Sequence, residues 1–204
     1  MYFTPIILRQ TGLGTQAALV ATIGAGVVAV VATFLGIWMI GRFARRFTLL
    51  SGLAGVVFAH MGLGATLLLM AGSPMQSMVA LGFILLALLF IQMMVSPLYW
   101  LLMSELFPIR ARGVLTGLSV AAQWMFNATV SFLFPAVLHW IGASTFFGFA
   151  AINLLSLLFV ARFVPETKGM SLEQLEHYLE DHFSPTDSAE VPVDGARQQM
   201  ARGL

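Results

Sequence analysis

Five long apolar runs, separated by short polar segments, constrain the fold of this chain more than any other feature of its sequence. The runs cover residues 13–41, 47–72, 77–104, 114–140 and 144–164. The hydrocarbon core of a bilayer is about 30 Å thick, and an α-helix of about 20 apolar residues crosses it. Each run is long enough to do so. The sequence therefore predicts an all-α membrane protein with five transmembrane helices.

Charged residues are scarce and lie almost entirely outside these runs. They make up 9% of the 204 residues, whereas a soluble domain contains about 25%. Eight of the nine acidic residues follow the last run, and the ninth, Glu105, lies at the end of the third. No carboxylate therefore lies in the middle of a predicted span. We expect any proton-carrying carboxylate of this system to lie outside this chain.

Several classes of function are excluded by composition. A net charge of +1 offers no basic surface for nucleic acid. The chain has no cysteine, which excludes disulfides, iron–sulfur clusters and thiol catalysis. No catalytic triad, metal-ligand cluster or phosphate-binding glycine loop is apparent, so we predict no enzyme activity, no metal and no cofactor. His60, a lone histidine in the second run, is expected to be packed or hydrogen-bonded rather than to relay protons.

The basic residues orient the spans. Those at the end of the first, third and fifth runs, or just after them, are Arg42, Arg45, Arg46, Arg110, Arg112, Arg162 and Lys168. The opposite side carries Arg9 alone, because the segments 71–77 and 139–144 contain no lysine or arginine. The positive-inside rule then places the start of the chain outside and the C-terminus in the cytoplasm. We expect a multi-pass protein of the cytoplasmic (inner) membrane.

The segment 165–183 differs in character from the spans. Its proline, Pro165, ends the fifth span, and Ser171 and Gln174 are spaced as a capping box that begins a helix. Three leucines on one face make that helix amphipathic: Leu172, Leu175 and Leu179. We therefore expect a short cytoplasmic helix here. Residues 184–204, which are polar and rich in helix breakers, are predicted to be disordered.

Polar side chains at helical spacing follow one face of the fourth predicted span. They are Thr116, Ser119, Gln123, Asn127 and Ser131, with Trp124 beside them. In the third span Gln92, Ser96 and Trp100 are spaced by four, and Pro97 bends the helix between them. Amides offer hydrogen-bond donors and acceptors, and indoles offer flat apolar faces. The two spans together predict a cavity lining for an uncharged, polyhydroxylated ring.

These amides have a second interpretation, as groups that hold helices together at about 0.6 kcal/mol each. We favour the cavity for Gln92, Gln123 and Asn127, because two tryptophans accompany them. For Asn153 and Ser156 in the fifth span we favour hydrogen bonds between helices.

Several motifs resemble those of sugar porters in the major facilitator superfamily. SELFPIRARG (104–113) resembles the cytoplasmic loop between that family's tenth and eleventh helices, and VPETKGMSLEQLE (164–176) resembles its ending after the twelfth. GRFARR (41–46) is similar to the loop between helices eight and nine, and SPLYWLLMSE (96–105) to the G-P-x-x-W stretch of the tenth. VAAQW followed by Asn127 is similar to the eleventh helix.

The resemblance extends from MYFTP, which looks like the end of the seventh helix, to about residue 180. Its closest likeness is to porters of myo-inositol and related polyols. Three positions depart from the family pattern: Gly41 replaces an aspartate, Ala44 replaces a glycine, and Ser96 stands where glycine is common.

The resemblance implies a fold, a function and a set of site residues. The fold would be the last five helices of a twelve-helix major facilitator fold, and the function sugar or polyol transport by alternating access with proton symport. The sugar site would include Trp100, Gln123, Trp124 and Asn127, to which the polar pattern adds Gln92 and Ser96. A cytoplasmic network that latches the outward-facing state would comprise Arg42, Arg46, Glu105, Arg110, Arg112 and Glu166.

The partners implied are a sugar or polyol, a proton, the lipid bilayer and the missing N-terminal half of the transporter. Two other functions remain open from the sequence. One is a truncated membrane remnant that transports nothing. The other is a membrane module that binds or senses a sugar without moving it.

Overall fold

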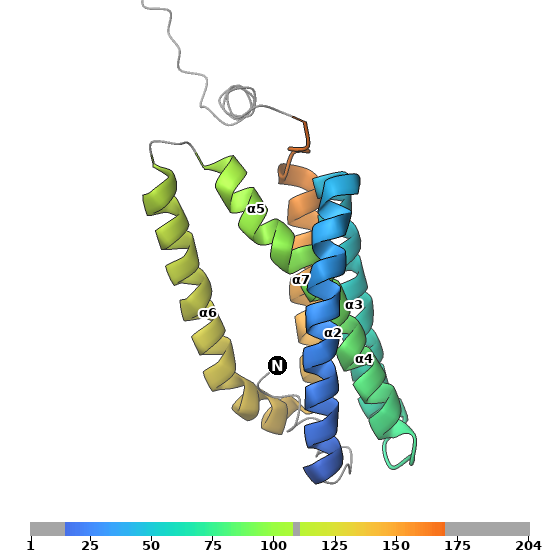
Figure 1. The fold of residues 1–204 in the computed structure, drawn as a ribbon. Helices are drawn as coiled ribbons and strands as arrows, with labels where there is room; N and C mark the ends of the chain where they lie inside the picture. The colour runs from blue at the N-terminus through green and yellow to red at the C-terminus, as the bar shows by residue number, and fades with distance from the viewer. Residues whose placement is uncertain (1–14, 108–110, 170–204) are drawn as a thin grey trace, which may run out of the picture. The chain divides into compact units, whose positions relative to one another are not determined.

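The computed structural model describes residues 15–107 and 111–169, and all the secondary structure in these residues is helical. The helices are α2 (Thr15–Arg42), α3 (Arg45–Leu69), α4 (Gln76–Phe90), α5 (Ser96–Leu106), α6 (Arg112–Ile141) and α7 (Ser144–Phe163), with a π-helical turn, η1 (Ile91–Val95), between α4 and α5 (Figure 1). The amphipathic helix and disordered tail predicted after residue 170 lie outside the described residues.

Five of the helical segments are long and apolar enough to cross a membrane, and they correspond to the five predicted runs. Four are the single helices α2, α3, α6 and α7, and the fifth is the continuous segment Gln76–Met103, which contains α4, η1 and most of α5. The prediction of five membrane-spanning helices is confirmed at the level of length and composition.

The third span is interrupted one turn before its proline. Pro97 is near the start of α5 and has no N–H to donate to the carbonyl of Met93, four residues earlier. At η1 the helix instead forms wider turns, in which the Ser96 N–H donates to the Ile91 carbonyl, five residues earlier. The sequence predicted a bend at Pro97, and the structure shows that the bend takes the form of a π turn.

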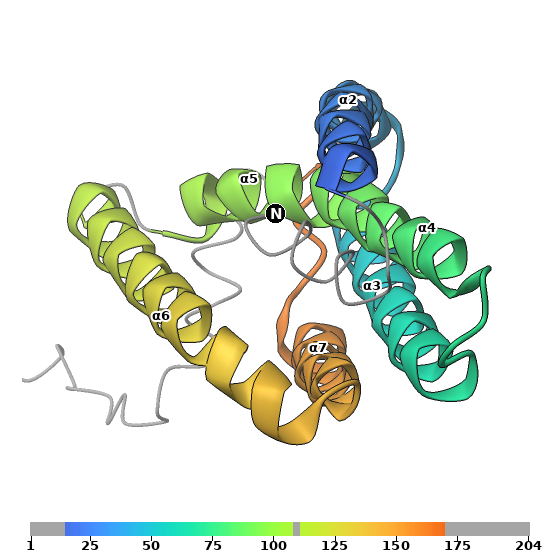
Figure 2. The same cartoon turned by 90° about the horizontal axis from the view of Figure 1, so that it is seen from below.

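α3 is the most enclosed of the helices. It packs against α4, η1 and α7, while α2 packs against η1 and α4 (Figures 1 and 2). One cluster of buried side chains joins the end of α3 to α4, α6 and α7: Leu63, Ala80, Phe134, Leu138 and Phe146. A second joins the start of α3 to α5 and the end of α7: Leu49, Leu53, Leu98, Leu102 and Val160.

α6 has a different environment. It contacts α5 near its first turn and α7 at its last turns, and the views show no other helix alongside its middle (Figures 1 and 2). Every residue from Ala121 to Val130 is exposed. The helix that carries the predicted polar stripe is thus the least covered of the helices described.

Candidate functional site: a polar face and a cytoplasmic cluster

The predicted ring-binding residues of the third span lie within the π turn and in the helix that follows it. Gln92 lies within η1 and is half-buried, and Ser96 is the first residue of α5. Trp100 is 51% exposed and meets the ring of Tyr99 edge-to-face at 5.4 Å. Because a π turn adds a residue to the helix, Gln92 and Trp100 do not have the angular relation that a regular spacing of four predicts.

The predicted residues of the fourth span lie on the uncovered part of α6. Gln123 and Asn127 are exposed, and neither forms a hydrogen bond with another described residue. Trp124 beside them is 61% exposed. In the described part of the chain, the main packing partners of α6 are α5 and α7. The lining of a ring-binding cavity by these residues stays a prediction.

Three polar residues of the other spans have local partners. The His60 Nδ1–H donates to the Val56 carbonyl at 2.9 Å, and its ring lies 6.0 Å from that of Phe149. Asn153 donates to the Phe149 carbonyl and Ser156 to the Ile152 carbonyl, each one turn back on α7. The interpretation of His60 as a hydrogen-bonded, packed residue agrees with its contacts. The prediction of hydrogen bonds between helices is wrong for Asn153 and Ser156.

Glu166, a predicted member of the cytoplasmic network, caps the start of α3. Its carboxylate accepts hydrogen bonds from the backbone N–H groups of Arg45 (2.9 Å) and Arg46 (3.1 Å), the first residues of α3. Ala44 precedes them and offers no side-chain cap. A carboxylate at a helix N-terminus satisfies free N–H groups and interacts favourably with the helix dipole. A residue that follows α7 thus completes the start of α3.

Arg45 extends this cluster to α5. Its guanidinium forms an ion pair with Glu105 and donates to the carbonyl and hydroxyl of Thr167 at 3.5 and 3.4 Å. Arg46 donates to the Ala161 carbonyl at the end of α7. We call Arg45, Arg46, Glu105, Glu166 and Thr167 the cytoplasmic cluster, after the side of the membrane predicted from the basic residues.

The remaining predicted members of the cytoplasmic network have other contacts. The Arg42 guanidinium lies over the Trp38 ring, 4.7 Å from its centroid. The Arg112 Nε donates to the Phe107 carbonyl at 3.3 Å, and Arg110 lies outside the described residues. Four buried side-chain polar atoms have no hydrogen-bond partner in the described part of the chain: Oε2 of Glu105, Nη2 of Arg112, Nε of Arg45 and Oγ1 of Thr145.

Sequence reasoning missed Arg45, Thr167 and Lys168, whose Nζ donates to the Gly41 carbonyl at the end of α2. The sequence pattern indicates Arg45 only as one of the basic residues that orient the spans. Whether Arg45 or Arg46 faces Glu105 depends on the residue at which α3 begins. One signal could have indicated these contacts: Ala44, the residue before Arg45, has no side chain that can cap a helix, so the first N–H groups of α3 need an acceptor from elsewhere in the chain.

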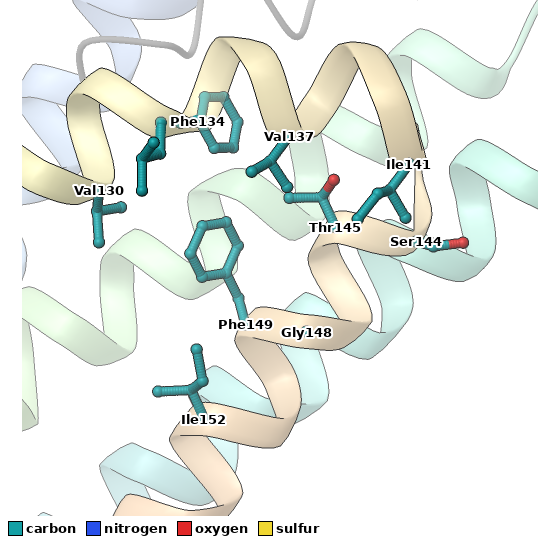
Figure 3. A pocket seen from close by; sticks show the side chains of 10 residues that line it. Val130, Phe134, Val137, Ile141, Ser144, Thr145, Gly148, Phe149 and Ile152 are labelled. Carbon is teal, nitrogen blue, oxygen red and sulfur yellow. The ribbon is translucent and has the colours of Figure 1, made fainter.

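An apolar cavity of about 280 Å³ lies between the last turns of α6 and the first turns of α7 (Figure 3). Its walls include Val130, Phe134, Val137 and Phe149, and its polar members are Ser144 and Thr145. A sugar needs several hydrogen-bonding groups around its ring. This cavity offers two hydroxyls and no amide, and it contains none of the predicted site residues.

Comparison with known proteins identifies the class. A family model described as "Sugar (and other) transporter" matches residues 1–179. The chain therefore belongs to the sugar transporter family of the major facilitator superfamily, whose members matched here are transporters and not enzymes.

Two relatives illustrate the match. The chain is 48% identical over 177 residues to the major myo-inositol transporter IolT of Bacillus subtilis, a match that covers 86% of this chain and 37% of the relative. It is 32% identical over 193 residues to the D-xylose-proton symporter of Escherichia coli, covering 91% of this chain and 38% of the relative. The chain thus spans well under half of the length of these relatives.

Solved structures of a xylose transporter have the same fold over the matched part. The proton:xylose symporter XylE bound to 6-bromo-6-deoxy-D-glucose aligns with a TM-score of 0.76 at 33% identity, covering 87% of this chain and 38% of that one. The inward-open conformation of XylE from E. coli aligns with a TM-score of 0.71 at 30% identity, covering 86% and 40%.

Proposed function

We propose that this chain supplies the last five helices of a twelve-helix sugar porter, which carries a sugar or polyol across the inner membrane by alternating access. The observation that carries the proposal is the 48% identity to a myo-inositol transporter over 177 residues. Myo-inositol is accordingly the first substrate to test. Proton symport is the proposed coupling, since a related protein is a D-xylose-proton symporter.

The proposed substrate site combines the two polar faces described above. Gln123, Trp124 and Asn127 on α6 would face Gln92, Ser96 and Trp100 around the bound ring. The support is physical: amides exposed on a membrane-spanning helix require a polar partner, because lipid offers none. A hydroxylated ring would supply donors and acceptors to the amides and apolar C–H faces to the indoles.

The coupling proton would be carried elsewhere in the transporter. Glu105 and Glu166 lie at helix ends, and the described spans contain no other carboxylate. A carboxylate inside the membrane is the usual proton carrier of such systems. We therefore place it in the part of the transporter that this chain does not contain.

The cytoplasmic cluster is proposed to latch the inward side in the outward-facing state. It joins the ends of α3, α5 and α7 within this chain, so these helices would move together. Glu105 and Arg112 each retain a buried polar atom without a partner among the described residues. Buried charged groups without complete partners are costly, and charges from the other half of the transporter would complete them when the inside is closed.

A chimera tests the transport proposal. The 177-residue matched part of the Bacillus subtilis myo-inositol transporter is replaced by the matched residues of this chain. The chimera is expressed in cells without myo-inositol uptake of their own. We expect accumulation of labelled myo-inositol that a protonophore abolishes. A chimera that reaches the membrane in normal amount but accumulates neither myo-inositol nor xylose would refute the proposal.

A tag at the C-terminus of the native gene gives an independent test. If the chain is part of a transporter of ordinary length, the tagged membrane protein should migrate well above the 22.1 kDa calculated for these residues. A band at 22.1 kDa requires a separate partner chain, which co-purification through the same tag should recover. Such a band without a partner, in cells that show no uptake, would argue against transport.

A further inference from the structure

The π turn of the third span is held between two neighbouring helices by glycines. Gly36 on α2 lies so close to η1 that a Cβ added to it would overlap the carbonyl group of Met93. On the opposite side a Cβ at Gly52 of α3 would lie 2.6 Å from the Met94 Cβ. Ser51 of α3 also donates to the Met94 Sδ at 3.6 Å. Two consecutive residues of η1 are thus each contacted by a different helix.

The Gly36 contact differs from the others in the atoms that it involves. Gly55 and Gly62 face the rings of Phe90 and Phe83, which are side chains that can rotate away. Gly36 faces backbone atoms, since the Met93 Cα lies 3.1 Å from the added Cβ as well. A backbone atom in a helix can move only if the helix itself moves. A side chain at position 36 would therefore displace the π turn and not merely a neighbouring side chain.

The Met93 carbonyl is also the group that Pro97 affects. An α-helix would bring the N–H of residue 97 to this carbonyl, and proline has no N–H. The absence of that bond favours the wider π turn. The backbone of α2 approaches the same carbonyl at Gly36, where close backbone contact between membrane helices is stabilising. Pro97 and Gly36, which lie on different helices, thus both affect the peptide group of Met93.

We infer that Gly36 is a positioning residue for Gln92: by admitting the Met93 backbone against α2, it holds η1 in the π conformation and fixes where the adjacent Gln92 is presented. The consequence for sugar binding rests on the proposed function. The geometric part does not, because it concerns only the placement of residue 92. The two parts can therefore be tested separately.

Thiol labelling measures the placement of residue 92 directly. The chain has no cysteine, so Gln92→Cys introduces a single reactive thiol. Its rate of reaction with a small cationic methanethiosulfonate is measured in membranes that contain the whole chain. Adding Gly36→Ala should change that rate by about tenfold, the scale expected when a close-packed backbone contact is forced apart.

The chain offers matched controls for this experiment. Gly26, on the same helix as Gly36, has no atom within 4 Å of an added Cβ. Gly26→Ala should therefore leave the labelling rate of the thiol at position 92 unchanged. A thiol introduced by Gln123→Cys on α6, which does not pack against α2, should label at one rate in both glycine backgrounds. An equal rate for Gln92→Cys in the Gly36→Ala and Gly26→Ala backgrounds would overturn the inference.

Pro97→Ala provides a second variant if Gly36→Ala does not reach the membrane. This change adds no atom near α2 and restores the N–H that a regular helix would bring to Met93. The labelling rate at position 92 should again change, and an unchanged rate would overturn the inference. In the chimera, Gly36→Ala should raise the KM for myo-inositol, while Gly26→Ala should not. Altered labelling without any transport by the parent chimera would support the positioning role and reject the proposed function.

Discussion

α3 and α6 are membrane-spanning helices of 25 and 30 residues with opposite surroundings. α3 is buried at intervals along its length, from Thr48 to Thr66, and its neighbours all belong to this chain. Of the residues of α6, all of which are described, only Phe134 and Leu138 are buried. The other helices of this chain cover part of the surface of α3, whereas they leave most of the surface of α6 uncovered.

The sequences of the two helices explain the difference. α3 contains Gly52, Gly55, Gly62 and Gly64, which allow neighbouring helices to approach closely, and the hydroxyls of Thr48 and Thr66 bond to carbonyls one turn back. α6 contains amides that have no local partner. A helix whose polar groups are satisfied internally can be packed with apolar neighbours, whereas a helix with free amides requires a polar partner.

The largest effect that we predict from the contrast between α3 and α6 is the loss of transport when an amide of α6 is removed. In the chimera described above, Gln123→Ala should reduce uptake of myo-inositol to background while leaving the amount of protein in the membrane unchanged. The expected loss is about a hundredfold or more, because a site built to bond a hydroxyl leaves that hydroxyl unpaired. Uptake is measured with labelled substrate at several concentrations.

Thr129→Ser is the matched control on the same helix, since the Thr129 hydroxyl bonds the Met125 carbonyl one turn back and serine retains that bond. It should leave uptake near that of the parent chimera. Normal uptake by the Gln123→Ala chimera would remove Gln123 from the proposed site.

The second effect concerns packing. Leu98 of α5 is completely buried in the cluster at the start of α3, whereas Leu118 of α6 is 67% exposed. Leu98→Ala should lower the free energy of unfolding by about 2–5 kcal/mol because it leaves a cavity. Leu118→Ala should change it by less than about 0.5 kcal/mol. Unfolding by sodium dodecyl sulfate in mixed micelles measures both, and equal losses would contradict the described packing.

The third effect concerns the cap that Glu166 provides. Glu166→Ala removes the acceptors of the Arg45 and Arg46 N–H groups and should destabilise the start of α3 by about 1–2 kcal/mol. Glu166→Gln keeps one oxygen and should show an intermediate loss. Hydrogen exchange of the Arg45 and Arg46 amides should accelerate in the same order. Unchanged exchange in Glu166→Ala would show that the carboxylate does not cap α3.

The sequence predicted those parts of this architecture that depend on length, composition and periodicity. The five spans followed from the apolar runs, and the polar stripe from the spacing of Gln123 and Asn127. The contact of Glu166 with α3 joins residues separated by 121 positions. No local pattern specifies such a contact, and the cytoplasmic network that the family resemblance implied included Glu166 and Glu105 but not Arg45.

The π turn shows a different limit of sequence reasoning. Pro97 indicated that the third span is interrupted, because proline removes a hydrogen bond wherever it lies in a helix. Whether the helix kinks, unwinds or widens depends on what packs beside the opening. Here Gly36 and Gly52, from two other helices, provide the space for a wider turn. That information is distributed over three spans.

The smallest effect tests polar groups that already have local partners. Ser156 of α7 is exposed, and its hydroxyl donates to the Ile152 carbonyl of the same helix at 3.0 Å. That carbonyl also belongs to the ordinary helical ladder, so the hydroxyl adds a bond that the helix does not require. Ser156→Ala should therefore alter the free energy of unfolding by less than about 0.5 kcal/mol and leave uptake by the chimera unchanged. A loss of uptake comparable to that of Gln123→Ala would contradict this prediction. It would mean that a polar group can take part in transport even though it already has a hydrogen-bond partner within its own helix.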